Sequence, residues 1–287
     1  MGKMDKPNTP LVSVIVTTKN EEKNIERFLK SVKNQTYKNL EVIVVDNNST
    51  DRTKAISKKY TNKVFNEGPE RSAQRNLGVE KANGEYVFIL DADMELTSKV
   101  VEDSIQTVMD GSYKVLVIPE KTQGTGFIST IRKFEREMYM GDLSIEVARV
   151  FSKKVFKEFG GYDLALTGPE DYDLPYRISK KHKIGRSHEY IYHHEATLTL
   201  PKLLKKRFYY AYHGALYAEK HPELIRTQGN FLFRRAYFKH WINFVKNPVT
   251  GILFILVKAL ETVWAIAGFI SQVGVVGFAK AFYRMLV

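Results

Sequence analysis

The sequence predicts an α/β fold built on a mainly parallel sheet. Between Leu11 and Met94, short β-rich runs alternate with segments of helical periodicity, as in consecutive βαβ units. Polar and acidic clusters follow several of these runs, where a parallel sheet opens its ligand crevice. Beyond Leu200 the composition becomes basic and apolar. We therefore predict a flexible N-terminus (residues 1–10), one α/β domain (11–200) and a C-terminal helical region (201–287).

The first half of the predicted domain has the clearest alternation of strand and helix patterns. Apolar and β-branched runs predict strands at residues 11–17, 41–45, 64–65 and 86–90. Apolar spacing of three and four residues predicts helices at residues 21–32, 51–60 and 72–81. No GxGxxG sequence follows the first strand, which argues against a dinucleotide-binding Rossmann site.

The second half, from Val100 to about Ala196, is less regular and predicts an α+β arrangement. We expect a helix to Met109, a strand at 114–119, a loop at 123–126, a helix at 128–140 and a strand at 145–151. A turn at 160–163, a helix from Glu170 and a last strand at 189–193 complete it.

Composition limits the partners and the compartment. Lys and Arg outnumber Asp and Glu by 44 to 32, and a net charge of +12 favours polyanions: nucleic acid, an anionic membrane or phosphate-bearing substrates. The absence of cysteine excludes disulfides, thiolate metal sites and a cysteine nucleophile, and fits a reducing compartment. The polar first ten residues do not resemble a signal peptide, so we expect the α/β domain in the cytoplasm.

Acidic side chains after the predicted strands are the first candidates for chemistry. Asp91 and Asp93 directly follow the run 86–90, and Asp46 follows the run 41–45. Carboxylates at these strand ends suit Mg²⁺ or Mn²⁺ and, through the metal, a diphosphate. Each cluster could equally be a turn or helix cap. Three such clusters at successive strand ends, with Thr18–Glu22 as the third, are poorly explained by capping alone.

Four segments in order carry a recognisable pattern. They are VSVIVTTKNEE, VIVVDNNSTD, RSAQRNLGVEKANGEYVFILDADM and GPEDYDL. Over residues 11–196 the chain resembles the family 2 glycosyltransferases, which have a GT-A-type, Rossmann-like nucleotide-binding fold. The resemblance implies an inverting hexosyltransferase that uses a nucleotide sugar, UDP by family frequency, and a divalent metal, Mn²⁺ or Mg²⁺.

The resemblance also implies roles for residues on the donor side. Those expected near the nucleotide, base, ribose or phosphates are Thr18, Asn20, Glu22, Asp46, Arg71, Arg75 and Asp91. Asp93 would ligate the metal, with Asp91 beside it. Related enzymes place a further metal ligand or diphosphate contact at a histidine like His193 or His194. The alternative for each histidine is a partly buried side chain that bonds to the backbone.

The segment GPEDYDL matches the acceptor side of the family. By that match Asp171 is the general base, and Glu170 orients it or the acceptor. An acceptor hydroxyl has a pKa far above neutrality, so the chemistry requires a positioned base. The alternative is that Asp171 or Asp173 caps a helix. Pro169 stands where the family commonly has glycine, which leaves the shape of this loop open.

The C-terminal region predicts contact with a membrane. Residues 251–278 contain two charges, Lys258 and Glu261, and are long enough to cross a bilayer. Basic residues flank both ends, so a helix lying in the interface, or a hairpin dipping into it, is favoured over a single span. A buried helix in a soluble core or oligomer is the alternative. The basic and aromatic stretch 202–217 suits the headgroup region.

The predicted protein is therefore a cytoplasmic-face, membrane-associated enzyme. Similar enzymes with such tails act on polyprenyl-linked acceptors, which the resemblance implies here. A nucleotidyltransferase with the same acidic metal site is the second hypothesis, and a soluble glycosyltransferase whose tail packs in an oligomer is another. Nucleic-acid binding is disfavoured because the positive charge concentrates beside apolar sequence. The sugar, the acceptor hydroxyl and the oligomeric state stay open.

Overall fold

The computed structural model describes residues 9–195, 198–224 and 234–286 of the chain. Most of the expected flexible N-terminus, residues 1–8, lies outside the described residues. The chain forms two compact units. The first comprises Met1–Ile118, Ala148–Tyr162 and Pro175–Ile191, and the second comprises Pro119–Val147, Asp163–Leu174 and Tyr192–Val287. Each unit is considered by itself below.

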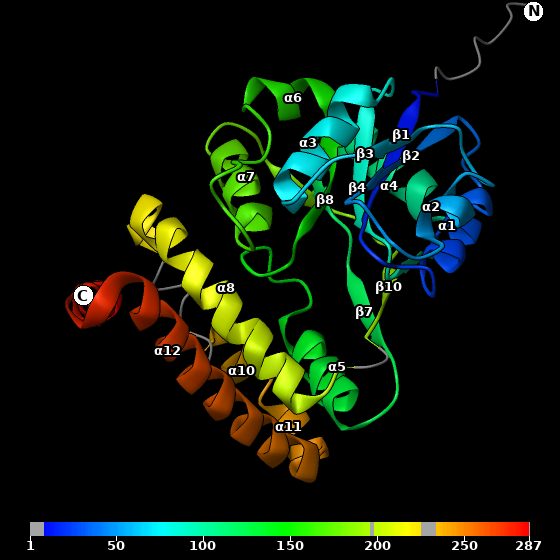
Figure 1. The fold of residues 1–287 in the computed structure, drawn as a ribbon. Coiled ribbons are helices and arrows are strands. Elements are labelled where there is room, and N and C mark those ends of the chain that lie inside the picture. Colours follow the sequence, from blue (N-terminus) through cyan, green and yellow to red (C-terminus); the bar gives the residue numbers. More distant parts are fainter. Residues whose placement is uncertain (1–8, 196–197, 225–233, 287) are drawn as a thin grey trace, which may run out of the picture. The chain divides into compact units, whose positions relative to one another are not determined.

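A seven-stranded sheet is the centre of the first unit (Figure 1). Its strands, in spatial order, are β3 (Val64–Asn66), β2 (Leu40–Asp46), β1 (Val12–Thr18), β4 (Tyr86–Asp91), β8 (Ala148–Ser152), β6 (Val115–Val117) and β9 (Ile184–Arg186). All neighbours pair in parallel except β8, which is antiparallel to both β4 and β6. Strand β1 is buried along its whole length, as its apolar run predicts for a central strand covered on both faces.

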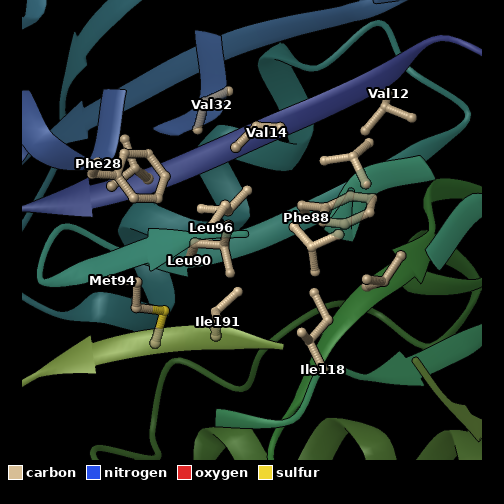
Figure 2. Packing of buried hydrophobic residues seen from close by; sticks show 14 of the residues in the cluster. Val12, Val14, Phe28, Val32, Phe88, Leu90, Met94, Leu96, Ile118 and Ile191 are labelled. Carbon is tan, nitrogen blue, oxygen red and sulfur yellow. The ribbon is translucent and has the colours of Figure 1, made fainter. Parts of the chain in front are cut away.

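Helices cover both faces of this sheet. They are α1 (Ile25–Lys33), α2 (Thr53–Ser57), α3 (Arg71–Lys81), α4 (Val100–Gly111) and α6 (Lys153–Glu158). Figure 2 shows one face, where Val12 and Val14 of β1 and Phe88 of β4 pack in one buried cluster that includes α1 and α4. Helix α3 lies on the opposite face, where a Cβ on Gly78 would approach Ile15 to 2.3 Å. Glycine at this position allows α3 to approach β1 closely.

The second unit is mainly helical. It contains β7 (Glu120–Gln123), α5 (Phe127–Tyr139), most of β10 (Ile191–His194), α8 (Leu200–Lys220), the short η1 (Pro222–Leu224), α10 (Arg235–Lys239), α11 (Ile242–Lys246) and α12 (Pro248–Leu286). Strands β7 and β10 are neighbours in a small sheet. An aromatic cluster joins α5, α11 and α12, with the Phe134 ring 5.2 Å from that of Phe244 and 5.5 Å from that of Phe254.

Helix α12 packs along α8, and Figure 1 shows the two side by side. One stripe of α12 is buried, and it includes Phe254, Val257 and Ala265 together with the charged Lys258 and Glu261. The opposite stripe is apolar and exposed. Residues 248–284 are long and apolar enough to cross a membrane, and a third of the most apolar stretch is buried. A kink at Gly274, with φ of +71°, interrupts the helix near its end.

The expected α/β order is confirmed, and the differences have local causes. The helix expected from residue 21 begins at Ile25, because Asn20 adopts a positive φ of 55° and Asn24 N donates to Glu21 O in a turn. The strand expected from residue 145 begins at Ala148, because Ile145 lies in a turn after Asp142. The short elements β5 (Met94–Leu96), β7, α6 and β9 were not expected, and α7 (Glu170–Ser179) begins where predicted.

Candidate functional site

The carboxyl ends of three strands meet at one edge of the large sheet. Thr17 of β1 lies opposite Asp91 of β4, and Thr18 lies opposite Asp46 of β2. This register brings the predicted polar clusters after the three strands to a common edge, where parallel α/β sheets bind ligands.

Asp46 joins the loops that follow β1 and β2. Its carboxylate is fully buried and accepts hydrogen bonds from Thr18 Oγ1 at 2.9 Å and from Ser49 N at 2.7 Å. Lys54 Nζ lies 3.5 Å from it. The turn-forming alternative is therefore realised at Asp46, and a contact with a nucleotide base stays a prediction.

Asn20 and Glu22 connect the same two loops. Asn20 Oδ1 accepts a hydrogen bond from Thr50 N at 2.9 Å, and Glu22 Oε2 accepts one from Arg52 N at 3.2 Å. The residues predicted to surround the nucleotide thus hold two strand-end loops together. Arg71, at the first position of α3, is exposed.

Two buried arginines hold Asp91. Arg75 Nη2 lies 3.2 Å from Asp91 Oδ1, and Arg149 Nη1 lies 3.5 Å from Asp91 Oδ2. Arg75 is fully buried, with its guanidinium 5.4 Å from the centre of the Tyr162 ring, and Arg149 is 4% exposed. Thr17 Oγ1 makes a third contact with Asp91, at 3.4 Å. Two cations around one strand-end carboxylate orient it, and they add positive potential at this edge.

Further carboxylates lie near Asp91. Asp93 follows in the turn between β4 and β5, and Glu21 lies in the loop after β1. Burial raises the pKa of the Glu21 carboxyl above its ordinary value, and the negative charges of Asp93 and Asp91 raise it further. The carboxylates of Asp91 and Asp93 therefore lie near enough to Glu21 to affect its ionisation. Hard carboxylate oxygens of this kind fit Mg²⁺ or Mn²⁺.

The predicted metal ligands are divided between the units. Asp91 and Asp93 belong to the first unit, and His193 and His194 belong to the second. Across the described parts of the chain, no group of three or more His, Asp or Glu side chains is arranged to hold a metal. The four-residue metal set therefore stays a prediction.

The predicted acceptor-side residues stand at the start of α7, in the second unit. Glu170 is 2% exposed and Asp171 is half-buried. Asp173 is fully buried and lies 2.8 Å from His221 Nε2 and 2.9 Å from Lys220 Nζ. Asp173 therefore anchors the start of α7 to the end of α8.

His193 is held by a carboxylate that the sequence did not indicate. Its Nδ1 lies 3.0 Å from Glu120 Oε2, and the same oxygen accepts a hydrogen bond from Arg136 Nη1 at 2.9 Å. A carboxylate on one ring nitrogen fixes the orientation of a histidine, as it does for metal-binding histidines.

This contact is the first link of a chain of ion pairs through the second unit. From Arg136 the chain passes to Glu195 at 3.5 Å, to Arg132 at 3.3 Å and to Glu135 at 2.9 Å. Lys258 of α12 lies 2.7 Å from Glu135 and also pairs with Glu261. Arg207 of α8 lies 2.9 Å from Glu261. We call the nine residues His193, Glu120, Arg136, Glu195, Arg132, Glu135, Lys258, Glu261 and Arg207 the ion-pair chain.

Comparison with known proteins identifies the family. The family model described as Glycosyl transferase family 2 matches residues 13–159, slightly more than half of the chain. The chain belongs to this family. The match includes Thr18, Asp46, Asp91 and Asp93, so the donor-side motifs lie within it, whereas the GPEDYDL segment at residues 168–174 lies beyond it.

Curated glycosyltransferases are similar to this chain over part of its length. A GalNAc(5)-diNAcBac-PP-undecaprenol beta-1,3-glucosyltransferase of Campylobacter jejuni is 30% identical over 182 residues, which cover 55% of this chain and 58% of that protein. An uncharacterized glycosyltransferase of Rickettsia typhi is 26% identical over 250 residues, covering 78% of each. The alignment with the first relative thus spans less than two thirds of its length.

Solved structures show the same fold. The mannosyltransferase PcManGT of Pyrobaculum calidifontis, solved with GDP-Man and Mn²⁺, has a TM-score of 0.59 at 17% identity, covering 98% of this chain and 88% of that one. Residues 1–349 of TarS from Staphylococcus aureus have a TM-score of 0.53 at 22% identity, covering 96% and 92%. The family 2 fold expected from the motifs is therefore confirmed.

Sequence reasoning missed two residues of the strand-end site, Arg149 and Glu21, and the partner of His193, Glu120. Arg149 gives a signal, since a cation inside the apolar run 148–151 needs a buried partner. Glu21 lies within the recognised TKNEE segment, beside the predicted Glu22. Glu120 gives no signal, because its role depends on β7 and β10 being neighbours.

Proposed function

We propose that this family 2 protein is an inverting, metal-dependent glycosyltransferase that moves a sugar from a nucleotide sugar, a UDP-sugar, to a membrane-held, polyprenyl-linked acceptor. The observation that carries the proposal is the strand-end carboxylate of Asp91, which forms ion pairs with Arg75 and Arg149. The carboxyl groups of Glu21 and Asp93 lie nearby. Family membership supports the assignment of this edge as the donor site.

On the donor side, Asp91 and Asp93 would hold Mn²⁺ or Mg²⁺. The bound metal supplies positive charge to the diphosphate of the donor. Arg75 and Arg149 orient Asp91 and add to the positive potential at the leaving group. Complexes of related folds with UDP, with UDP-GlcNAc and with GDP-Man and Mn²⁺ support a nucleotide-sugar donor.

On the acceptor side, we assign Asp171 as the general base. The acceptor oxygen attacks the anomeric carbon, its proton passes to the Asp171 carboxylate, and the bond from the anomeric carbon to the phosphate oxygen breaks. The electron pair leaves with the nucleoside diphosphate, and attack from the opposite face inverts the anomeric carbon. Glu170 would orient the base, and Glu120 would hold His193 toward the metal or the diphosphate.

The membrane part of the proposal rests on α12 and on one relative. The relative from Campylobacter jejuni is named for an undecaprenol-linked acceptor, and the exposed stripe of α12 is apolar. We place the protein at the cytoplasmic face, with the C-terminal region in or on the bilayer. Deleting residues 247–287 should then move the protein to the soluble fraction, and unchanged membrane partitioning would refute this part.

A panel of nucleotide sugars tests the donor assignment directly. We expect one donor to raise the unfolding temperature of the wild-type protein when Mn²⁺ is present. Asp93→Ala should lose this protection and all transfer. Asp171→Asn should keep the protection and lose transfer, so near-normal turnover in this variant would show that the base is wrongly assigned. Release of nucleoside diphosphate, rather than pyrophosphate, separates glycosyl transfer from nucleotidyl transfer.

A further inference from the structure

We infer that α10, α11 and α12 form a binding surface for anionic phospholipids of a single leaflet, with α12 lying in the plane of that leaflet. The inference extends the membrane association proposed above, because it specifies the lipid chemistry, the contact residues and the orientation of the helix. It does not depend on which sugar is transferred.

Exposed apolar side chains form the larger part of this surface, which we call the apolar face. Its principal residues, each more than half exposed, are Phe238, Trp241, Val245, Ile252, Leu256 and Val263. Phe238, Trp241 and Val245 also line a hollow of about 540 Å³ that reaches Phe254 and Ile255 of α12. A patch of this kind on an ordinary soluble surface would be unusual and marks a site of association.

A basic hollow adjoins the apolar face on the other side of α10. Arg235, Lys239 and His240 line this second hollow, of about 460 Å³, together with the turn around Asp142. The Asp142 carboxylate is engaged by the backbone and hydroxyl of Ser144. Arg235 and Lys239 are four residues apart, so they share one face of α10, and their hollow shares no lining residue with the hollow at Phe238. Helix α10 therefore presents cations on one side and hydrocarbon on the other, as a lipid phosphate above its acyl chains requires.

Charge complementarity selects the anionic lipid as the occupant. From residue 234 to the C-terminus the sequence contains one acidic residue, Glu261, which is buried and paired with Arg207. The exposed charges that border the apolar face, such as Lys239 and Lys246, are basic. Two copies of this surface would bring like charges together, whereas an anionic leaflet neutralises them.

The ion-pair chain determines how α12 meets the bilayer. Lys258 and Glu261 lie near the middle of the apolar segment and are bound to Glu135 of α5 and Arg207 of α8. If α12 crossed the hydrocarbon core, Lys258 and Glu261 would either separate from Glu135 and Arg207 or carry these partners into the lipid. Both outcomes cost free energy, because charged groups are poorly solvated in hydrocarbon. With α12 in the plane of the leaflet, the charged stripe stays against the protein and the opposite stripe faces the acyl chains.

Intrinsic fluorescence gives a direct test, because the only tryptophans of the chain, Trp241 and Trp264, lie on this surface and are 61% and 44% exposed. The full-length protein is titrated with vesicles of phosphatidylcholine alone or with 30% phosphatidylglycerol. We expect a blue shift and tight binding with the anionic vesicles, weak binding with the neutral ones, and weaker anionic binding as salt rises. Equal binding to both vesicles, or no effect of salt, overturns the inference.

Charge variants test whether the basic hollow binds the anionic lipid. The double variant Arg235→Gln/Lys239→Gln should bind anionic vesicles about 30-fold more weakly, since each basic residue near the surface contributes about fivefold. The matched control, Lys58→Gln/Lys59→Gln, removes the same charge from exposed positions at the end of α2 and should bind like wild type. If both double variants lose the same amount of vesicle binding, the loss is explained by net charge alone and the basic hollow is not a lipid-binding site. Circular dichroism and donor-dependent thermal protection, measured on the same samples, report separately on folding and on the proposed function.

Quenching by lipids brominated at different depths tests the orientation in the wild-type protein. Trp264 lies about 24 Å beyond Pro248 along a helix of 39 residues, about 58 Å long at 1.5 Å per residue, so it is near the midpoint of α12. An in-plane helix keeps both tryptophans shallow, and a spanning helix places Trp264 near the bilayer centre. Strong quenching by the deepest bromines would refute the in-plane arrangement. A stable dimer that does not bind vesicles would show that a second copy covers the apolar face instead.

Discussion

Replacing Glu135 by glutamine should destabilise the protein more than any surface charge change. The Glu135 carboxylate is 3% exposed and accepts contacts from Arg132 at 2.9 Å, from Lys258 at 2.7 Å and from the Tyr237 hydroxyl at 3.1 Å. Glutamine keeps the shape of the side chain but removes the charge that compensates the buried Lys258 and the partly buried Arg132. Breaking a buried pair from one side costs about 3–5 kcal/mol, and at about 2–4 °C per kcal/mol the unfolding temperature should fall by roughly 6–20 °C.

The contribution of Glu135 to the stability of the protein changes with pH in a definite direction. Burial opposes ionisation of Glu135, but the positive charges of Lys258 and Arg132 outweigh it, and the pKa is held well below its usual range. A depressed folded-state pKa contributes stability that is fully present above the unfolded value of about 4.3 and is lost as the pH falls toward the folded value. The difference between wild type and Glu135→Gln should therefore be constant from pH 5 to 7 and should narrow below about pH 4.

Thermal unfolding followed by circular dichroism, from pH 3 to 7, measures both effects. Glu80→Gln is the matched control, because Glu80 is exposed and its one described ion pair is with the adjacent Lys81. We expect no measurable shift for the control. An unfolding temperature for Glu135→Gln equal to that of wild type would refute the role of the ion-pair chain, and so would a difference that widens in acid.

Further predictions concern packing and the candidate site. Gly268→Ala should destabilise by about 1–3 kcal/mol, because its Cβ would lie 2.3 Å from the backbone oxygen of Phe208 in α8. Gly214 of α8 has open space around it, so Gly214→Ala should be neutral or stabilising by up to about 1 kcal/mol. If chemical denaturation shows Gly214→Ala to be less stable than Gly268→Ala, this account of the packing between α8 and α12 is wrong. Arg149→Gln should raise the KM for the donor about 10-fold or more, because a hydrogen bond to a charged group contributes about 1.5–3 kcal/mol. Arg149→Lys should restore part of the loss. An unchanged KM would show that Arg149 does not contribute to the donor site. Glu120→Gln should raise the Mn²⁺ concentration for half-maximal transfer about 10-fold while leaving the donor KM nearly unchanged, and an unaltered metal requirement would separate His193 from the metal.

The large sheet could be predicted from the sequence because its signals are local. Buried strands such as β1 and β4 are continuous apolar runs, and α3 has a helical pattern over eleven residues. Short elements were missed where the pattern is too brief or too polar, as in the strand β7 with its sequence EKTQ. Such strands form because neighbouring backbone supplies hydrogen bonds, which the local sequence does not encode.

The candidate site was predictable to the extent that its residues lie in motifs. Asp91, Asp46 and Thr18 meet at the sheet edge as strand-end residues should. The residues that hold them come from elsewhere in the chain: Arg149 reaches Asp91 only because β8 pairs with β4. The polar stripe of α12 was visible as Lys258 and Glu261, but its partners Glu135 and Arg207 lie more than fifty residues away. Contacts of that separation arise from tertiary packing, which spacing along the sequence does not reveal.

Mn²⁺ binding to Asp93 tests the donor site most directly. In electron paramagnetic resonance, the signal of free Mn²⁺ should fall by about one equivalent when wild-type protein and UDP are present together. Asp93→Ala, with an unchanged circular dichroism spectrum, should leave the free signal nearly intact. If the variant removes as much free Mn²⁺ as wild type does, the strand-end carboxylates do not hold the metal, and the donor site must be sought elsewhere in the chain.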